Sequence, residues 1–187
     1  MNREHLIFCA SDEWRAVLED FILPWVLTDV ELGSEVIEVG SGPGLVTDVL
    51  RTRVSRLTAV EIDPDLAATL RERLAGTNVD VVQADATALP QESDRFSGAV
   101  SFTMLHHVPS VELQDRLFAE LARVLAPAGM LVLSDSIASD DLRAFHDGDT
   151  YNPVDPTTLP ERLATAGFSA IDVHANEFGW MAHAQKR

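Results

Sequence analysis

The segment Glu35–Gly44 constrains the fold of this chain more than any other part of the sequence. Its first half, Val36–Val39, is a short and mostly β-branched apolar run of the kind that forms buried strands. Three glycines then alternate with other residues, and an apolar pattern with helical spacing follows at Leu45–Leu50. Glycine has no Cβ, so such a turn brings main-chain N–H groups close to a ligand, beside the positive end of a helix dipole. The sequence therefore predicts a strand, a ligand-binding loop and a helix.

The spacing of these glycines separates two kinds of nucleotide-binding loop. The dinucleotide fingerprint G-x-G-x-x-G requires a glycine where this chain has Leu45, which disfavours NAD. The stretch instead resembles the E/D-x-G-x-G-x-G motif of class I S-adenosylmethionine (SAM) dependent methyltransferases, carried here by Glu38, Gly40, Gly42 and Gly44. A simple tight turn is the alternative explanation of three glycines at the end of a strand.

Two acidic residues follow the second predicted strand, Leu57–Glu61, and they have different expected roles. Asp63 precedes Pro64, so its side chain is expected to cap a helix that begins at this proline. Glu61 has no such structural role in the sequence. It lies about twenty residues after the glycine loop, the spacing at which an acid accepts the ribose hydroxyls in nucleotide-binding α/β units. We expect Glu61 to bind a ligand, and a solvated acid at a strand end is the alternative.

The third and fourth predicted strands, Val79–Gln83 and Phe96–Phe102, lead into two further loops. Asp85 matches the acid that the methyltransferase family places after the third strand. The resemblance implies that its carboxylate accepts from the adenine amino group, while the N–H of Ala86 donates to the ring. An ordinary turn residue is the alternative for Asp85. The loop Thr103–Pro109 resembles the segment that lies beside the transferred methyl group in this family.

The resemblance covers nearly the whole chain. Arg123–Asp135 resembles the helix, Pro/Gly turn and fifth strand of the family, and two alternating apolar stretches, Ala170–Ala175 and Phe178–Ala184, resemble its terminal antiparallel pair. It implies SAM as the cofactor and S-adenosylhomocysteine (SAH) as the product. The cofactor-binding residues that it implies are Glu38, Gly40, Ser41, Gly42, Gly44, Glu61, Ile62, Asp85, Ala86 and Thr103.

The order of these segments predicts an α/β fold: a doubly wound, Rossmann-like, mostly parallel sheet with an antiparallel C-terminal strand pair and helices on both faces. We expect a single methyltransferase domain over residues 1–187, with a short N-terminal helical cap at 1–33 and the SAM-binding core at 34–187. Helices are expected over Val111–Val124 and Leu159–Gly167, and a loop near the active face over Ser139–Pro156.

His106 and His107 are the candidate catalytic bases, because histidine titrates near neutral pH and both residues follow the fourth strand. Packing and helix capping are the alternative roles for this pair. The six histidines do not combine with acids in a recognisable ligand spacing, so no metal is expected. The Asn-Pro-Pro-aromatic signature of related amine and nucleobase methyltransferases is absent after the fourth strand, where Phe102–Leu105 stands, and this favours an oxygen or carbon acceptor.

Charge and composition lead to expectations about partners. Thirty acidic residues against fourteen basic ones give a formal charge of −16, and Lys186 is the only lysine. Such a surface repels polyphosphates, so we expect a small-molecule acceptor and no nucleic acid. Arg51, Arg53 and Arg56 form a local basic cluster that is best explained as charge at the end of a helix. The absence of a signal-peptide pattern and of a long apolar run predicts a cytoplasmic protein without a membrane partner.

Three questions stay open in the sequence. The cap before the first strand is short, so the acceptor site is either open or completed by a second copy in a homodimer, with Trp14, Trp25 and Trp180 as candidate contributors. A SAM-binding regulatory or scaffolding protein without turnover is the alternative to an enzyme. A nucleotide-dependent oxidoreductase is a further alternative, which Leu45 disfavours.

Overall fold

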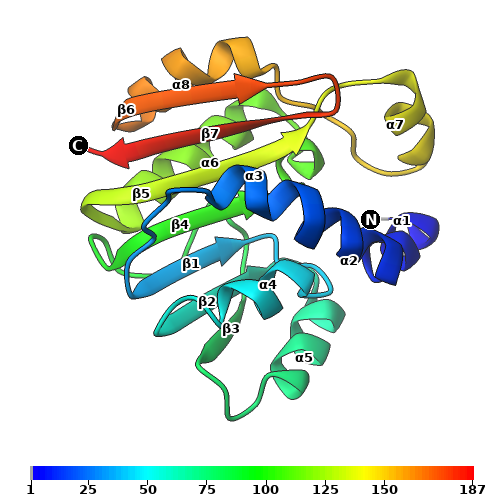
Figure 1. The fold of residues 1–187 in the computed structure, drawn as a ribbon, viewed down its shortest axis with the longest axis horizontal. Helices are drawn as coiled ribbons and strands as arrows, with labels where there is room; N and C mark the ends of the chain where they lie inside the picture. Colours follow the sequence, from blue (N-terminus) through cyan, green and yellow to red (C-terminus); the bar gives the residue numbers. More distant parts are fainter. Residues whose placement is uncertain (1) are drawn as a thin grey trace.

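The computed structural model describes residues 2–187, which form a central sheet with helices on both faces (Figure 1). The seven strands lie in the order β3-β2-β1-β4-β5-β7-β6. Their bounds are Glu35–Val39 (β1), Arg56–Glu61 (β2), Val79–Gln83 (β3), Phe96–Phe102 (β4), Leu125–Ser136 (β5), Phe168–Ala175 (β6) and Gly179–Lys186 (β7).

The strand order reverses at β1, which pairs in parallel with β2 on one side and with β4 on the other. Val36 lies opposite Leu57 of β2 and opposite Gly98 of β4. In doubly wound sheets, ligands bind in the crevice outside the carboxyl ends of the strands at such a reversal. The loops after β1 and β4 therefore flank the expected ligand crevice. Antiparallel pairing of β7 with β5 and β6 confirms the predicted fold class.

Helices cover both faces of this sheet, and the first two helices of the chain lie beyond the carboxyl ends of its parallel strands (Figure 1). They are α1 (Arg3–Cys9), α2 (Asp12–Val17), the π-helical turn η1 (Leu18–Ile22), α3 (Leu23–Leu27), α4 (Leu45–Leu50), α5 (Pro64–Arg73), the 3₁₀ turn η2 (Leu105–His107), α6 (Val111–Val124), α7 (Asp140–Phe145), the 3₁₀ turn η3 (Pro156–Thr158) and α8 (Leu159–Ala166). Asp63 caps α5 as predicted, because its Oδ1 accepts from the N–H groups of Asp65 and Leu66 at 2.9 and 3.0 Å.

Two large apolar clusters hold the layers together, one on each face of the sheet. Phe118 and Leu121 of α6 pack with Leu163 of α8 in the first cluster, and Leu23 and Val26 of α3 belong to the second. Burial of such side chains is the main stabilising contribution in a domain of this size. Within residues 2–187, no helix has both the length and the apolar character needed to cross a bilayer.

Two local expectations were wrong. The predicted turn around Pro127 is a bulge within β5, because Leu125 lies opposite Phe96 and Met130 opposite Gly98, which leaves four residues between these partners unpaired with β4. The expected loop over residues 139–156 contains α7, and Ser139 is its N-cap, accepting from the N–H of Leu142 at 3.1 Å. A serine followed by two acidic residues is a normal helix start, so local capping outweighed the loop-like composition here.

Candidate functional site

The glycine loop after β1 has the backbone conformation that the sequence predicted. Gly40, Gly42 and Gly44 have φ values of +79°, +52° and +88°, in the left-handed region that favours glycine. A Cβ at Gly40 would lie 2.2 Å from Cγ of Met104, and one at Gly44 would lie 2.4 Å from Cδ1 of Leu70. A Cβ at Gly42 would meet no atom within 4 Å. Gly40 and Gly44 therefore permit close packing, whereas Gly42 faces open space.

Glu61 joins the glycine loop to the end of β2. Its side chain is 6% exposed, with Oε2 accepting from the N–H of Gly42 at 2.7 Å and Oε1 accepting from the N–H of Asp63 at 2.9 Å. The premise that Glu61 has no structural role was therefore wrong, since the distant Gly42 donor was not visible in the sequence. The carboxylate is fixed in place by two main-chain donors at the edge of the crevice.

Glu38 lies beneath the same loop and is 3% exposed. Its Oε2 accepts from the hydroxyl of Thr47 at 2.7 Å. Burial, with a smaller effect from the nearby Glu61 carboxylate, raises the pKa of Glu38 from 4.5 to about 7, against the opposing effect of the Thr47 hydrogen bond. The folded chain therefore holds a proton on Glu38 under conditions where the unfolded chain has lost it.

Glu38→Gln is expected to stabilise the protein above neutral pH. Between pH 4.5 and 7 the folded state binds more protons at Glu38 than the unfolded state does. The contribution of Glu38 to the free energy of unfolding therefore has its full value below pH 4.5 and is lost as the pH rises through about 7. Glutamine stays neutral and still accepts from Thr47. We measure the free energy of unfolding in urea for both proteins. The difference between the variant and the wild type should be about 3 kcal/mol more favourable to the variant at pH 8 than at pH 4.5. Equal differences at both pH values would contradict this assignment, and exposed Asp80→Asn is the control.

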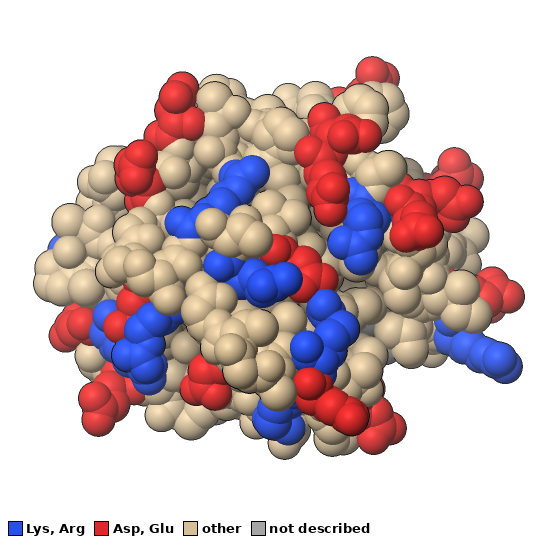
Figure 2. Space-filling view, turned by 60° about the horizontal axis from the view of Figure 1, so that its bottom comes forward, with Lys and Arg blue, Asp and Glu red and all other residues tan. Residues whose placement is uncertain are grey.

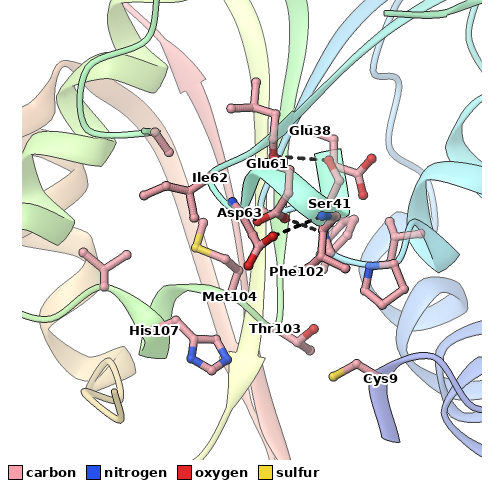
Figure 3. A pocket seen from close by; sticks show the side chains of 18 of the residues that line it. Cys9, Glu38, Ser41, Glu61, Ile62, Asp63, Phe102, Thr103, Met104 and His107 are labelled. Atoms are coloured by element: carbon pink, nitrogen blue, oxygen red, sulfur yellow. Dashed lines mark hydrogen bonds between the residues drawn. The ribbon is translucent and has the colours of Figure 1, made fainter. Parts of the chain in front are cut away.

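A cavity of about 510 Å³ opens above the loop, and Figure 3 shows its lining. Of the ten residues predicted to bind the cofactor, nine line it: Glu38, Gly40, Ser41, Gly42, Glu61, Ile62, Asp85, Ala86 and Thr103. The tenth, Gly44, packs on α5 instead. Ile62 is 61% exposed although it is apolar, because it borders the cavity. Asp85 is exposed and also forms a turn, with Oδ1 accepting from the N–H of Thr87 at 2.8 Å.

Thr103 marks the other end of this cavity. It has a φ of +52°, which is strained for a β-branched residue, and its N–H donates to the carbonyl of Ser134 at 2.8 Å. Figure 3 shows Thr103, His107 and Cys9 at this end of the cavity, away from the carboxylates of Glu38 and Glu61. The cavity therefore has an acidic end near the glycine loop and a histidine end near η2.

The two predicted histidines have different environments. His106 is 4% exposed, and its Nδ1 donates to Oδ1 of Asp135 at 2.6 Å, while its N–H donates to Oδ2 of the same residue at 3.0 Å. Despite full burial, hydrogen bonds and the facing His106 hold the pKa of Asp135 below its usual range. His107 lines the cavity, and burial lowers its pKa to about 3. His107 is therefore a neutral imidazole at physiological pH.

Two further histidines, His5 of α1 and His146 after α7, join this pair. Burial also lowers their pKa values, that of His5 to about 4. Neither residue stands out in the sequence beyond being one of its six histidines. No spacing signal could have grouped them, because they come from three separate segments. The spacing of the histidines in the sequence therefore gives no ground for excluding a metal site.

A second cavity, of about 620 Å³, adjoins the first. The two share His5, Cys9, Trp14 and Thr103 in their walls. The lining of the second cavity includes six large aromatic side chains: Phe8, Trp14, Phe21, Trp25, Phe145 and Phe178. Trp14 and Trp25 thus border this cavity, but the expected contribution of Trp180 was wrong, because that side chain is fully buried in the core.

Comparison with known proteins gives consistent matches. Residues 37–133 match the family described as "Methyltransferase domain". Over 101 residues the chain is 39% identical to ribosomal RNA small subunit methyltransferase A of Leptothrix cholodnii. This match covers 47% of this chain and 38% of that protein. Over 116 residues it is 37% identical to ornithine lipid N-methyltransferase of Singulisphaera acidiphila, covering 57% of each. The chain thus spans only 38% and 57% of these relatives.

The fold also has solved counterparts. A crystal structure of a SAM-dependent methyltransferase from Aquifex aeolicus superposes with a TM-score of 0.78 at 16% sequence identity, and the match covers all of both chains.

These comparisons contradict the prediction that nucleic acid is excluded as a partner. Three similar sequences are ribosomal RNA methyltransferases. Net charge sums over the whole surface, whereas a polyanion responds to the local electrostatic field. Figure 2 shows basic side chains spread among acidic ones over one broad face. The formal charge of −16 therefore gives no ground for excluding RNA.

Proposed function

Because this chain belongs to the class I SAM-dependent methyltransferase family, we propose that it is an enzyme that methylates a small molecule with SAM as donor. One observation supports this most directly. A cavity framed by the glycine loop and Glu61 shares a wall, at Thr103, with a second cavity lined by aromatic side chains. A donor and an acceptor held in these two spaces would meet at that wall.

The residues of the first cavity fit SAM. Glu61 offers a fixed carboxylate for the ribose hydroxyls, Asp85 an acceptor for the adenine amino group, and exposed Ile62 an apolar surface for the ring. The open space at Gly42 allows a ligand to approach the main chain. A volume of about 510 Å³ is in the normal range for a cofactor site. When bound, SAM supplies a methyl group on a positively charged sulfur.

Glu61→Ala is expected to weaken SAM binding by about 1 to 3 kcal/mol, which corresponds to roughly 5- to 150-fold in Kd. The change removes the acceptor for the ligand and also leaves the N–H groups of Gly42 and Asp63 without their partner. Calorimetric titration measures the effect, and exposed Asp80→Asn is the matched control. Unchanged affinity in Glu61→Ala would show that this carboxylate has no part in cofactor binding.

The second cavity supports an acceptor with an apolar body. Its aromatic walls favour burial of an apolar group, while Thr103 and the histidines provide polar contacts where the cavities meet. Holding an acceptor atom in line with the methyl group supplies roughly 7 to 11 kcal/mol of the barrier, so little further chemistry is required. The sequence Phe102–Leu105, which begins at the last residue of β4, supports an oxygen or carbon acceptor.

RNA is the second candidate acceptor, favoured by the similarity to ribosomal RNA methyltransferases over about half of this chain. Incubation with methyl-labelled SAM separates the two candidates. One reaction contains a fractionated pool of small metabolites and the other contains total RNA, with a heat-inactivated protein control in each. We expect label in the metabolite fraction. Label in RNA alone would overturn the proposed acceptor class while keeping the methyltransferase.

A further inference from the structure

Four imidazole rings meet at the wall between the two cavities. They belong to His5 of α1, His106 and His107 of η2, and His146 at the end of α7, and we call them the histidine cluster. One ring nitrogen of each lies within 4.8 Å of the others. The ring centroids of His106 and His107 are 4.3 Å apart, and those of His5 and His146 are 4.5 Å apart.

Hydrogen bonding does not satisfy this cluster. Across residues 2–187, seven buried side-chain nitrogen or oxygen atoms lack a hydrogen-bond partner, and four of them are ring nitrogens of the cluster. These atoms are Nδ1 of His5 and Nε2 of His106, His107 and His146. Buried polar atoms in folded proteins nearly always have a partner, so four unpaired nitrogens in one place indicate a missing ligand.

The partners of two rings identify what that ligand is. Nδ1 of His106 faces Oδ1 of Asp135, and Nδ1 of His146 faces the carbonyl of Leu142, both at 2.6 Å. Because a carbonyl and a carboxylate accept hydrogen bonds, each Nδ1 carries a proton, so Nε2 is the lone-pair atom of each ring in its neutral form. A carboxylate or carbonyl behind an imidazole is the usual support of a metal-ligating histidine. The cluster therefore presents lone pairs, which suit a cation.

We propose that His5, His106, His107 and His146 bind one divalent first-row transition-metal ion, of which Zn²⁺ is the representative. Neutral imidazole suits Zn²⁺, Cu²⁺, Fe²⁺ and Ni²⁺, and it is a poor ligand for Mg²⁺ or Ca²⁺. Four nitrogens bound tetrahedrally at roughly 2.1 Å lie about 3.4 Å apart. The present separations reach up to 4.8 Å, so rotation of the rings toward a common centre completes the site.

Negative charge near the cluster fits a cation. Asp135 contacts His106, and Oδ2 of Asp149 lies 3.7 Å from Nδ1 of His5 and 3.9 Å from Nδ1 of His107. The four ligands come from three segments, so the ion would also tie α1 and α7 to the core. The two helices already contact each other, since the side chain of Asn2, the N-cap of α1, donates to the carbonyl of Phe145 in α7 at 3.0 Å.

The position of the site has a consequence for the acceptor. His5 and His107 line the first cavity, and His106 and His146 line the second. An ion there would bind an oxygen of the methyl acceptor as an additional ligand and favour the deprotonated form of that oxygen. This consequence rests on the proposed methyl transfer, whereas the metal site does not.

The test uses tag-free protein stripped with a chelator and titrated with Co²⁺, whose visible absorption reports tetrahedral nitrogen coordination, followed by displacement with Zn²⁺. We expect one ion per chain with micromolar or tighter affinity. His106→Ala and His146→Gln should each abolish binding, and Asp135→Asn should weaken it by about 10- to 100-fold. His174→Ala, in the exposed terminal hairpin, should bind as the wild type does.

Circular dichroism of each variant keeps the test valid, and His146→Gln covers the case in which His106→Ala does not fold. Absence of stoichiometric Co²⁺ and Zn²⁺ binding by folded wild-type protein would overturn the proposal. Binding that survives in folded His146→Gln would also overturn it. None of these readouts uses SAM, and label transfer by the metal-free chain is scored separately, so failure of the metal site is distinguishable from failure of the proposed function.

Discussion

Replacing Gly42 with valine is expected to reduce the affinity for SAM and SAH by at least about 100-fold, or 2.7 kcal/mol. Gly42 has a φ of +52°, a conformation that β-branched side chains rarely adopt. Its Cβ would meet no protein atom within 4 Å, so the side chain would enter the space left for the ligand. The strained backbone would also displace the N–H of this residue, which donates to Oε2 of Glu61 at 2.7 Å. Calorimetric titration measures the loss.

Gly76→Val is the matched control for this change. Gly76 also has a positive φ, of +77°, and also lacks neighbours within 4 Å of a built Cβ, but it lines neither cavity. Both variants should therefore lose stability through backbone strain, while only Gly42→Val loses affinity. If Gly42→Val bound SAM as tightly as Gly76→Val, the loop would not be the cofactor site.

His107→Ala is expected to lower kcat by about 10²- to 10⁴-fold, the range for loss of a group that assists proton removal. His107 lines the first cavity at the end that adjoins the second, and burial keeps its imidazole neutral. The affinity for SAM should stay unchanged, because the residues proposed to hold the adenosine lie at the other end of the cavity. Steady-state kinetics with the acceptor found by label transfer measures the effect.

The same loss is expected if His107 acts through a bound ion, so this prediction concerns the position of the ring and not its chemical role. His174→Ala is the control, since His174 lies in the exposed hairpin and lines neither cavity. Full rates in both His106→Ala and His107→Ala would show that the pair is structural.

Features with a local signal were predicted well. The strand, glycine loop and helix at Glu35–Leu50, the Asp63 cap and the helix Val111–Val124 all lie where the sequence placed them. Each depends on residues close in the chain, through apolar periodicity, capping or the backbone freedom of glycine.

Features that depend on tertiary contacts were not predicted. The hydrogen bond from Gly42 to Glu61 forms between the ends of two neighbouring strands. The histidine cluster forms only because α1 and α7 pack against η2. The spacing of residues in the sequence does not predict either of these contacts. The exclusion of nucleic acid as a partner was wrong for the same reason, because a summed charge contains no information on where the charges lie.

Titration of the purified chain with SAM, SAH and NAD tests the central assignment most directly. We expect SAM and SAH to bind in the micromolar range, with a binding free energy of about 8 kcal/mol, and NAD to give no heat. Tight binding of NAD without any SAM signal would contradict it.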